Sequence, residues 1–446
     1  MTVSPRDGRR TRLGARLAVV AIAATIASCA GDDRVGGPSA TGTLATTSTT
    51  VTTTMPNSSI ATTSTDATTT EPTLSSPQPT LSPQPTLPPE PTLSPRSYDF
   101  SEVSPIVERF VAERGLDGAG LVVVDRDDGI VHEGYWGEFG PERVSLVASS
   151  SKMIVAGVLL RLADQGVLDL DRPIAELTGW RPEDPSTATA SVTVAQLLSN
   201  SSGFVGLETS ARYEPYLCQF DVEDDLERCG AAIFTTAADD RDVVAPDTGF
   251  RYGGGQWQVA GAVAEAVSGR SWSDLVTETY VEPCGVDSLG FTNQWAQYGP
   301  FTFEYPDSFD GDPDTLVPTA NPNMEGGAYL TAPDYAELLL MQLRAGRCGE
   351  TQVLSADSVE RMHTDRIIER YGPTGNPGLG GYGLGWWVRS PADGYVTDPG
   401  AYGAVPWLEL ADGYGVYLVV EENLFVGIAL ADQIREPIDR AITAAR

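Results

Sequence analysis

A long stretch of low sequence complexity limits how much of this chain can fold. Residues 41–95 contain 19 Thr, 10 Pro and 8 Ser, and the tripeptide Pro-Thr-Leu occurs four times between residues 72 and 93. Such a segment buries too little apolar surface to offset the conformational entropy lost on folding. We therefore expect a disordered or extended stalk over residues 29–96 and one folded domain over residues 97–446.

The N-terminus has the pattern of an export signal. Five arginines within the first 16 residues precede a ten-residue apolar run, Leu17–Ile26, which is too short to span a bilayer. The run leads into Ile26-Ala27-Ser28-Cys29, which resembles the lipobox of bacterial lipoproteins. We predict a signal peptide over residues 1–28 and lipidation of Cys29, which would anchor the domain to the outer face of the cell membrane. An ordinary secretory signal is the alternative.

The negative charge lies almost entirely in the folded region. The whole chain carries −32 at pH 7, and residues 97–446 hold 22 basic and 55 acidic side chains, a net charge of −33. This acidity argues against a nucleic-acid partner, because phosphate binding needs clustered Lys and Arg. With only two histidines, His132 and His363, a His-based metal site is not expected. We predict a monomer with a small-molecule substrate, no metal, no cofactor, and membrane contact through its lipid only.

Four cysteines remain in the folded region, as the pairs Cys218/Cys229 and Cys284/Cys348. An even number in an exported chain indicates two disulfides, and pairing of near neighbours is the simplest of the three connectivities. Free buried thiols are the alternative.

Hydrophobic patterning predicts strands near both ends of the folded region and helices between them. Strands are expected at residues 118–125, 130–136, 383–388, 405–410, 414–421 and 425–429. Helices are expected at residues 103–114, after Ser149, and at 194–198, 256–268, 272–280, 334–345 and 434–445. This order indicates an α/β fold of the α+β type, in which helices flank one antiparallel sheet built from both chain ends and a helical region is inserted.

The chain has a single lysine among 29 basic side chains, and this Lys152 follows Ser149 by three residues. The spacing puts both side chains on one face of a helix as it begins. A neutral lysine can accept the proton of a serine hydroxyl, whereas arginine cannot, because guanidinium stays charged. A helix N-terminus also favours neutral lysine and a nearby oxyanion. The alternative is a helix-capping serine beside an exposed lysine.

Other serine chemistries lack their residues. The sequence contains no Gly-x-Ser-x-Gly elbow, which argues against an α/β-hydrolase. A Ser-His-Asp triad would need His132 or His363, and both are interpreted as structural.

Several blocks in order resemble the penicillin-recognising serine hydrolases, in particular class C β-lactamase-related esterases and D-alanyl-D-alanine peptidases. The helix that begins near Ala148 ends in Ala163–Asp171, as the nucleophile helix of that family does. Residues 197–204 read Leu-Leu-Ser-Asn-Ser-Ser-Gly-Phe and are similar to the family block Leu-Leu-Ser-His-Thr-Ser-Gly-Leu. Residues 246–252, 282–285 and 326–334 also fit. The resemblance covers residues 98–446 and implies a β-lactamase/transpeptidase-like fold.

The resemblance also implies roles for individual residues. Ser149 would be the acylated nucleophile and Lys152 its proton acceptor. Tyr252 would match the tyrosine of the family's Tyr-x-Asn motif, a second acid/base group. The third motif aligns with Asp398-Pro399-Gly400, so the backbone N–H groups of Ala401 and Ser149 would form the oxyanion hole.

Gly254, Asp398 and Gly400 are the candidate substrate-binding positions, and the first two depart from the family pattern. Gly254 replaces the motif asparagine, so no side-chain amide is available there to hold substrate or Lys152. Asp398 stands where a cationic or imidazole group binds the carboxylate of penicillins and D-Ala-D-Ala ends. A carboxylate should repel such substrates unless Asp398 is simply a solvent-facing turn residue.

We therefore expect a cell-surface serine hydrolase that acts on esters or uncharged amides. D-alanyl-D-alanine carboxypeptidase or β-lactamase activity is one alternative, and a catalytically silent binding module of the same fold is another.

Overall fold

The computed structural model describes residues 96–182, 188–206, 214–236, 243–298, 304–374, 380–390 and 394–446. The predicted signal peptide, Cys29 and the predicted stalk up to residue 95 lie outside the described residues. Within the described part, no helix is both long and apolar enough to cross a membrane.

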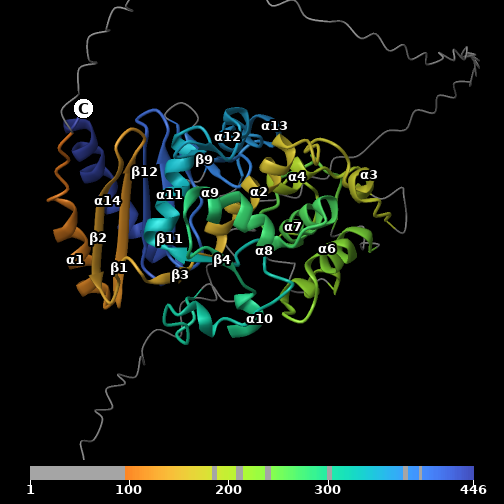
Figure 1. The fold of residues 1–446 in the computed structure, drawn as a ribbon, viewed down its shortest axis with the longest axis horizontal. Helices are drawn as coiled ribbons and strands as arrows, with labels where there is room; N and C mark the ends of the chain where they lie inside the picture. Colours follow the sequence, from red (N-terminus) through yellow and green to blue (C-terminus); the bar gives the residue numbers. More distant parts are fainter. Residues whose placement is uncertain are drawn as a thin grey trace, which may run out of the picture. The chain divides into compact units, whose positions relative to one another are not determined.

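A seven-stranded antiparallel sheet combines strands from the beginning and from the end of the folded region, and it lies beside α1 and α14 in Figure 1. Its strand order is β2-β1-β12-β11-β10-β9-β8. The early strands are β1 (Gly118–Asp125) and β2 (Gly129–Gly137). The late strands are β8 (Gly381–Tyr382), β9 (Trp387–Ser390), β10 (Tyr395–Thr397), β11 (Ala404–Glu409) and β12 (Tyr414–Val419). Pairing of β1 with β12 therefore confirms the prediction of one sheet built from both chain ends.

Helices cover both faces of this sheet, which is why all eight residues of β1 are buried. On one face, Leu121 and Val123 pack with α1 (Val103–Arg114) and α14 (Leu424–Ala444), which lie together in Figure 1. On the other face, Val122 and Val124 join the larger core, to which α11 (Ala332–Leu343) contributes. The alternation follows from the two-residue period of a strand.

The helical region is inserted between the early and late strands. It contains α2 (Lys152–Asp164), α3 (Ile174–Thr178), α4 (Val194–Leu198), α6 (Leu226–Thr235), α7 (Gly255–Ser268), α8 (Trp272–Val276), α9 (Glu282–Cys284) and α10 (Gln294–Tyr298). A second sheet has the order β3-β5-β4, with β3 (Val144–Leu146), β5 (Ala328–Thr331) and β4 (Gly290–Phe291). Further along the chain are β6 (Arg347–Cys348), β7 (Thr351–Gln352), α12 (Ala356–His363) and α13 (Ile368–Tyr371). Helix α2 packs against α7 and is almost wholly buried, so the helix predicted after Ser149 is a core helix.

Three predicted elements are wrong in kind or extent. Residues 425–429, predicted as a strand, are the first turns of α14, where the Asn423 side chain accepts hydrogen bonds from the N–H groups of Phe425 and Val426. Short apolar runs do not distinguish strand from helix. Most of the strand predicted at 383–388 is the turn between β8 and β9, and only its last two residues are extended. The helix predicted at 272–280 is α8 followed by a π-helical turn over Thr277–Val281.

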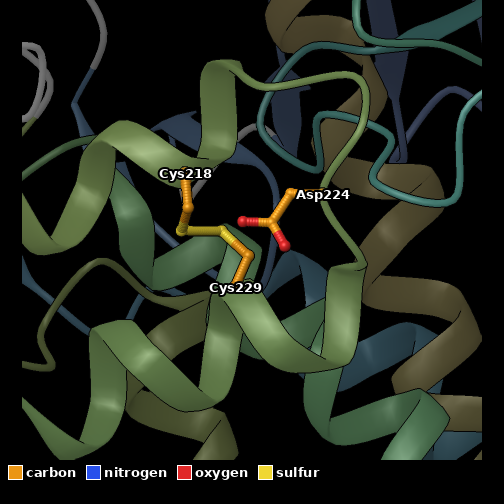
Figure 2. Close-up of side chains that lie close together, drawn as sticks. All are labelled: Cys218, Asp224 and Cys229. Carbon is orange, nitrogen blue, oxygen red and sulfur yellow. A yellow bond between two sulfur atoms is a disulfide. The ribbon is translucent and has the colours of Figure 1, made fainter.

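Both disulfides join cysteines that are consecutive in the sequence, Cys218 to Cys229 and Cys284 to Cys348. The carboxylate of Asp224 lies close to the first disulfide (Figure 2). The sulfur atoms of Cys218 and Cys229 are bonded to each other, and Asp224 forms an ion pair with Arg228. This group of side chains is therefore a covalent link beside an ion pair, without free thiolates for a metal.

Candidate active site

A strained turn presents Ser149 to the outside of an otherwise buried segment. Strand β3 is followed by Ala148, whose φ of 46° lies in the left-handed region, and by a 3₁₀ turn that leads into α2. The Ser151 hydroxyl stabilises the turn by donating to the Ala148 carbonyl (2.6 Å) and accepting from the Ala328 N–H (2.9 Å). Ser149 alone in this turn is partly exposed. Such strain is typical of functional turns.

Lys152 is buried directly behind Ser149. Its Nζ atom donates to the Ser149 Oγ atom at 3.1 Å and to the Glu325 backbone carbonyl at 2.6 Å. Burial lowers the pKa of Lys152 below its ordinary value, and the nearby carboxyl groups of Glu325 and Asp398 act in the opposite direction. The arrangement therefore favours a neutral amine in contact with the serine hydroxyl.

Tyr252, the residue that aligns with the tyrosine of the Tyr-x-Asn motif, lies against the same lysine. The Lys152 Nζ atom lies 4.8 Å from the centre of the Tyr252 ring, and that ring stacks on Trp387 with centroids 5.1 Å apart. Burial raises the pKa of Tyr252 well above its ordinary value, while proximity to Ser149 and Trp387 acts in the opposite direction. The phenol therefore stays protonated and can donate a proton.

The segment after β10 packs closely on the nucleophile turn. The Ser150 hydroxyl donates to the Asp398 carbonyl at 2.7 Å, and a Cβ atom on Gly400 would lie only 2.0 Å from the Val147 carbonyl oxygen. Among the described residues, the backbone N–H groups of Ser149 and Ala401 donate to no protein acceptor. Both donors are therefore available at this contact between the two segments.

The structure corrects the role expected of Asp398. Its side chain is 0% exposed, and neither carboxyl oxygen has a hydrogen-bond partner. Burial raises the pKa of Asp398 well above its ordinary value, with Lys152 opposing. Asp398 is therefore not a solvent-facing turn residue, and burial favours its protonated form over the anion that would repel such substrates.

Two residues of the site were missed from the sequence. Glu325 accepts the Gly254 N–H on Oε2 at 2.7 Å, and its Oε1 atom is buried without a partner. Asn200, buried in the block at 197–204, accepts from the Gly253 N–H at 3.1 Å and the Trp257 indole at 3.0 Å. Asn200 lies where the family block has histidine, and this difference was the sequence signal that could have identified Asn200 as a site residue. No local pattern marks Glu325, which is 173 residues from Lys152.

The two histidines make contacts that fit their structural interpretation. The His363 Nε2 atom lies 2.6 Å from the Gln342 Oε1 atom, and burial lowers the pKa of His363 to about 3. The His132 ring packs on Phe100 with centroids 4.6 Å apart. Neither makes a described hydrogen bond to Ser149.

Known proteins similar to this chain include hydrolases of several specificities. Penicillin-binding protein 4 of Amycolatopsis lactamdurans is 28% identical over 337 residues, which cover 71% of this chain and 84% of that protein. Esterase EstB of Burkholderia gladioli is 26% identical over 259 residues, covering 52% of this chain and 62% of that protein. Among solved structures, the hydrolase EstCE1, described as having promiscuous acyltransferase activity, aligns with a TM-score of 0.59 at 17% identity over 76% of this chain and 98% of its own.

The β-lactamase/transpeptidase-like fold is therefore confirmed by structures as well as by sequence. The Beta-lactamase family matches residues 103–436, which include the nucleophile turn, the Tyr252 segment and the Asp398-Pro399-Gly400 segment. On the strength of this match, the chain belongs to the β-lactamase family.

Proposed function

We propose that this protein is a serine hydrolase that works through an acyl-enzyme on Ser149. The observation that carries the proposal is the 3.1 Å hydrogen bond between the Ser149 hydroxyl and the buried, single lysine of the chain. Hydrolases of this family, including a penicillin-binding protein and an esterase, are the relatives of the chain.

In the proposed reaction, neutral Lys152 accepts the proton of Ser149 as Oγ bonds to the substrate carbonyl carbon. The Lys152 proton then passes through Tyr252 to the leaving alkoxide or amine as the bond between carbonyl carbon and leaving group breaks. Water subsequently attacks the acyl-enzyme, and the same groups carry its proton back to Ser149 Oγ. No redox step or additional co-reactant is needed.

The N–H groups of Ser149 and Ala401 are the proposed oxyanion hole. Charge that develops on the carbonyl oxygen needs donors that are already oriented and not satisfied by the protein. Neither N–H group donates to a protein acceptor among the described residues, and the tight contact at Gly400 brings their segments together. Ser149 itself lies in the 3₁₀ turn that leads into the N-terminus of α2, where the helix dipole favours an oxyanion.

Esters and uncharged amides remain the proposed substrates, because the site lacks a cation at the family position for a substrate carboxylate. The family position that holds a cation for a substrate carboxylate is occupied by Asp398, a buried acid whose pKa burial raises well above its ordinary value. A carboxyl group at this position, protonated or ionised, supplies no positive charge to attract a substrate carboxylate. Gly254 likewise lacks the side-chain amide of the second motif. The D-alanyl-D-alanine carboxypeptidase and β-lactamase activities are the alternatives, and Penicillin-binding protein 4 among the relatives favours keeping them in the test.

We further propose that lipidated Cys29 and the stalk hold the domain outside the cell membrane. The lipobox-like segment and the low-complexity stretch support this location. A palmitate-labelling experiment on wild type and Cys29→Ser tests it, because label in both proteins would contradict lipidation at this cysteine. The domain is proposed to act as a monomer, although one similar structure is an octameric penicillin-binding protein homologue. Sedimentation of residues 97–446 tests that state.

The activity test uses a p-nitrophenyl acetate assay together with a fluorophosphonate probe. Wild-type protein should hydrolyse the ester and gain one probe mass on Ser149, and Ser149→Ala should do neither. Hydrolysis of penicillin or a cephalosporin without esterase activity would favour the alternative substrates. Absence of any adduct with fluorophosphonate and penicillin probes would instead favour a silent binding module.

A further inference from the structure

Glu325 connects the two halves of the catalytic arrangement. Its backbone carbonyl accepts from the Lys152 Nζ atom at 2.6 Å, and its side-chain Oε2 atom accepts from the Gly254 N–H at 2.7 Å. Gly254 lies two residues after Tyr252 and is the N-cap residue of α7. One residue therefore links the lysine of α2 to the segment that carries the tyrosine.

This link replaces one that the sequence lacks. The side-chain amide expected in the second motif is absent at Gly254, and a Cβ atom there would lie 2.4 Å from the Val205 carbonyl oxygen. Gly254 also has a φ of 78°, which disfavours any other residue. Asparagine therefore does not fit this backbone without movement, and Lys152 donates instead to the Glu325 carbonyl from another segment.

We propose that Glu325 is a positioning residue that replaces the missing amide. It fixes Lys152 relative to Tyr252 and supplies the negative charge that controls how readily Lys152 is protonated. The inference rests on the proposed serine-hydrolase function, because it assigns Glu325 a role through Lys152.

The surroundings of the Glu325 carboxyl support an electrostatic role. Glu325 is 2% exposed and its Oε1 atom has no partner, so the group is not held by a structural ion pair. Burial raises the pKa of Glu325 to about 7, with Lys152 and the Gly254 N–H opposing. The titratable groups that face it are Lys152 from α2, Tyr252 before α7, and, across Lys152, Asp398 after β10. Burial therefore brings the pKa of Glu325 to about 7 at a position one hydrogen bond from Lys152.

The single lysine makes a direct test possible. Protein labelled with ¹³C-lysine gives one side-chain resonance, which belongs to Lys152 without assignment. In Glu325→Gln, loss of the carboxylate should lower the pKa read from this resonance by about one unit or more. In wild type, the same resonance should show a second inflection near pH 7 from titration of Glu325.

Glu265→Gln is the matched control. Glu265 is another poorly exposed carboxyl whose pKa burial raises to about 7, and it accepts the Trp272 N–H at 2.6 Å at the far end of α7. This variant should leave the Lys152 titration and the pH 7 inflection unchanged. An equal change in both variants, or no change in Glu325→Gln, would overturn the proposal.

The positioning role has a separate readout, the rate at which the fluorophosphonate probe reacts with Ser149. Glu325→Ala should slow labelling about tenfold or more, whereas glutamine, which keeps an acceptor for the Gly254 N–H, should restore most of the rate. If neither Glu325 variant folds, the titration of the Lys152 resonance in wild-type protein still tests the proposal. Absence of the second inflection near pH 7 would refute the role assigned to Glu325. Failure of the proposed function is distinct: Ser149 would take no probe in any variant, while the lysine titration would still report on Glu325.

Discussion

A single methyl group at Gly400 should separate the proposed oxyanion donors from the nucleophile. A Cβ atom added there would lie 2.0 Å from the Val147 carbonyl oxygen and 3.1 Å from the Ser150 Oγ atom. Real Cβ atoms keep about 3.0 Å or more from such an oxygen. The segment must therefore retreat by roughly 1 Å, because Val147 belongs to the buried backbone before the nucleophile turn.

A displacement of this size moves the Ala401 N–H away from the position of the developing oxyanion. A misplacement of about 1 Å costs on the order of 100-fold in rate. Removal of one oxyanion donor likewise costs about 100- to 1,000-fold, or roughly 2.7–4 kcal/mol of transition-state stabilisation. We therefore expect Gly400→Ala to lower kcat for p-nitrophenyl acetate by about 100-fold.

Gly140→Ala is the control, since nothing lies within 4 Å of its added Cβ and the position is away from the nucleophile turn. Circular dichroism and thermal melting establish that both variants are folded. Folded Gly400→Ala protein with kcat within twofold of wild type would refute the assignment of Ala401 to the oxyanion hole.

Three other results are expected. Lys152→Arg should lower kcat by about 100- to 10,000-fold, because guanidinium cannot accept the Ser149 proton, and retention of more than a tenth of the activity in folded protein would contradict this. Ester hydrolysis should rise with pH through a lysine pKa that burial holds below 10.5, so a pH–rate profile with its only limb at or above 10.5 would count against Lys152 as the base. Replacing the Cys284–Cys348 disulfide, which spans 64 residues, should lower the free energy of unfolding by about 4 kcal/mol, against about 3 kcal/mol for Cys218–Cys229, which spans 11. Urea denaturation of the two double Cys→Ala variants measures both, and the reverse order would contradict the loop-length argument.

Much of the fold followed from local patterns. The apolar run at 118–125 and the turn after it predicted β1 and the hairpin to β2, because side chains of a strand between two helical layers must be apolar throughout. The apolar run at 425–429 misled because an amphipathic helix and a strand share such a run over five residues. What decides between them is the Asn423 cap and the packing of α14 on the sheet, both outside the run.

The candidate site likewise contains residues that local sequence patterns predicted and residues that they did not. Ser149 and Lys152 were found because a helical turn places residues three apart together and because the chain keeps one lysine. Tyr252 required the family motif as well. Glu325 and Asn200 were missed, since their partners come from distant segments and no spacing in the sequence encodes those contacts.

The sequence by itself therefore determined which residue could be the nucleophile, which could take its proton, and where both chain ends would pair. Only the tertiary structure decided the charge state and the surroundings of the acids. Asp398 reads as an anion in the sequence, yet it is fully buried, and burial raises its pKa well above the ordinary value. Glu325 has no visible role in the sequence, yet it links Lys152 to Gly254. The physical reason is that ionisation depends on the solvent and charges around a group, which are fixed only when distant segments pack together.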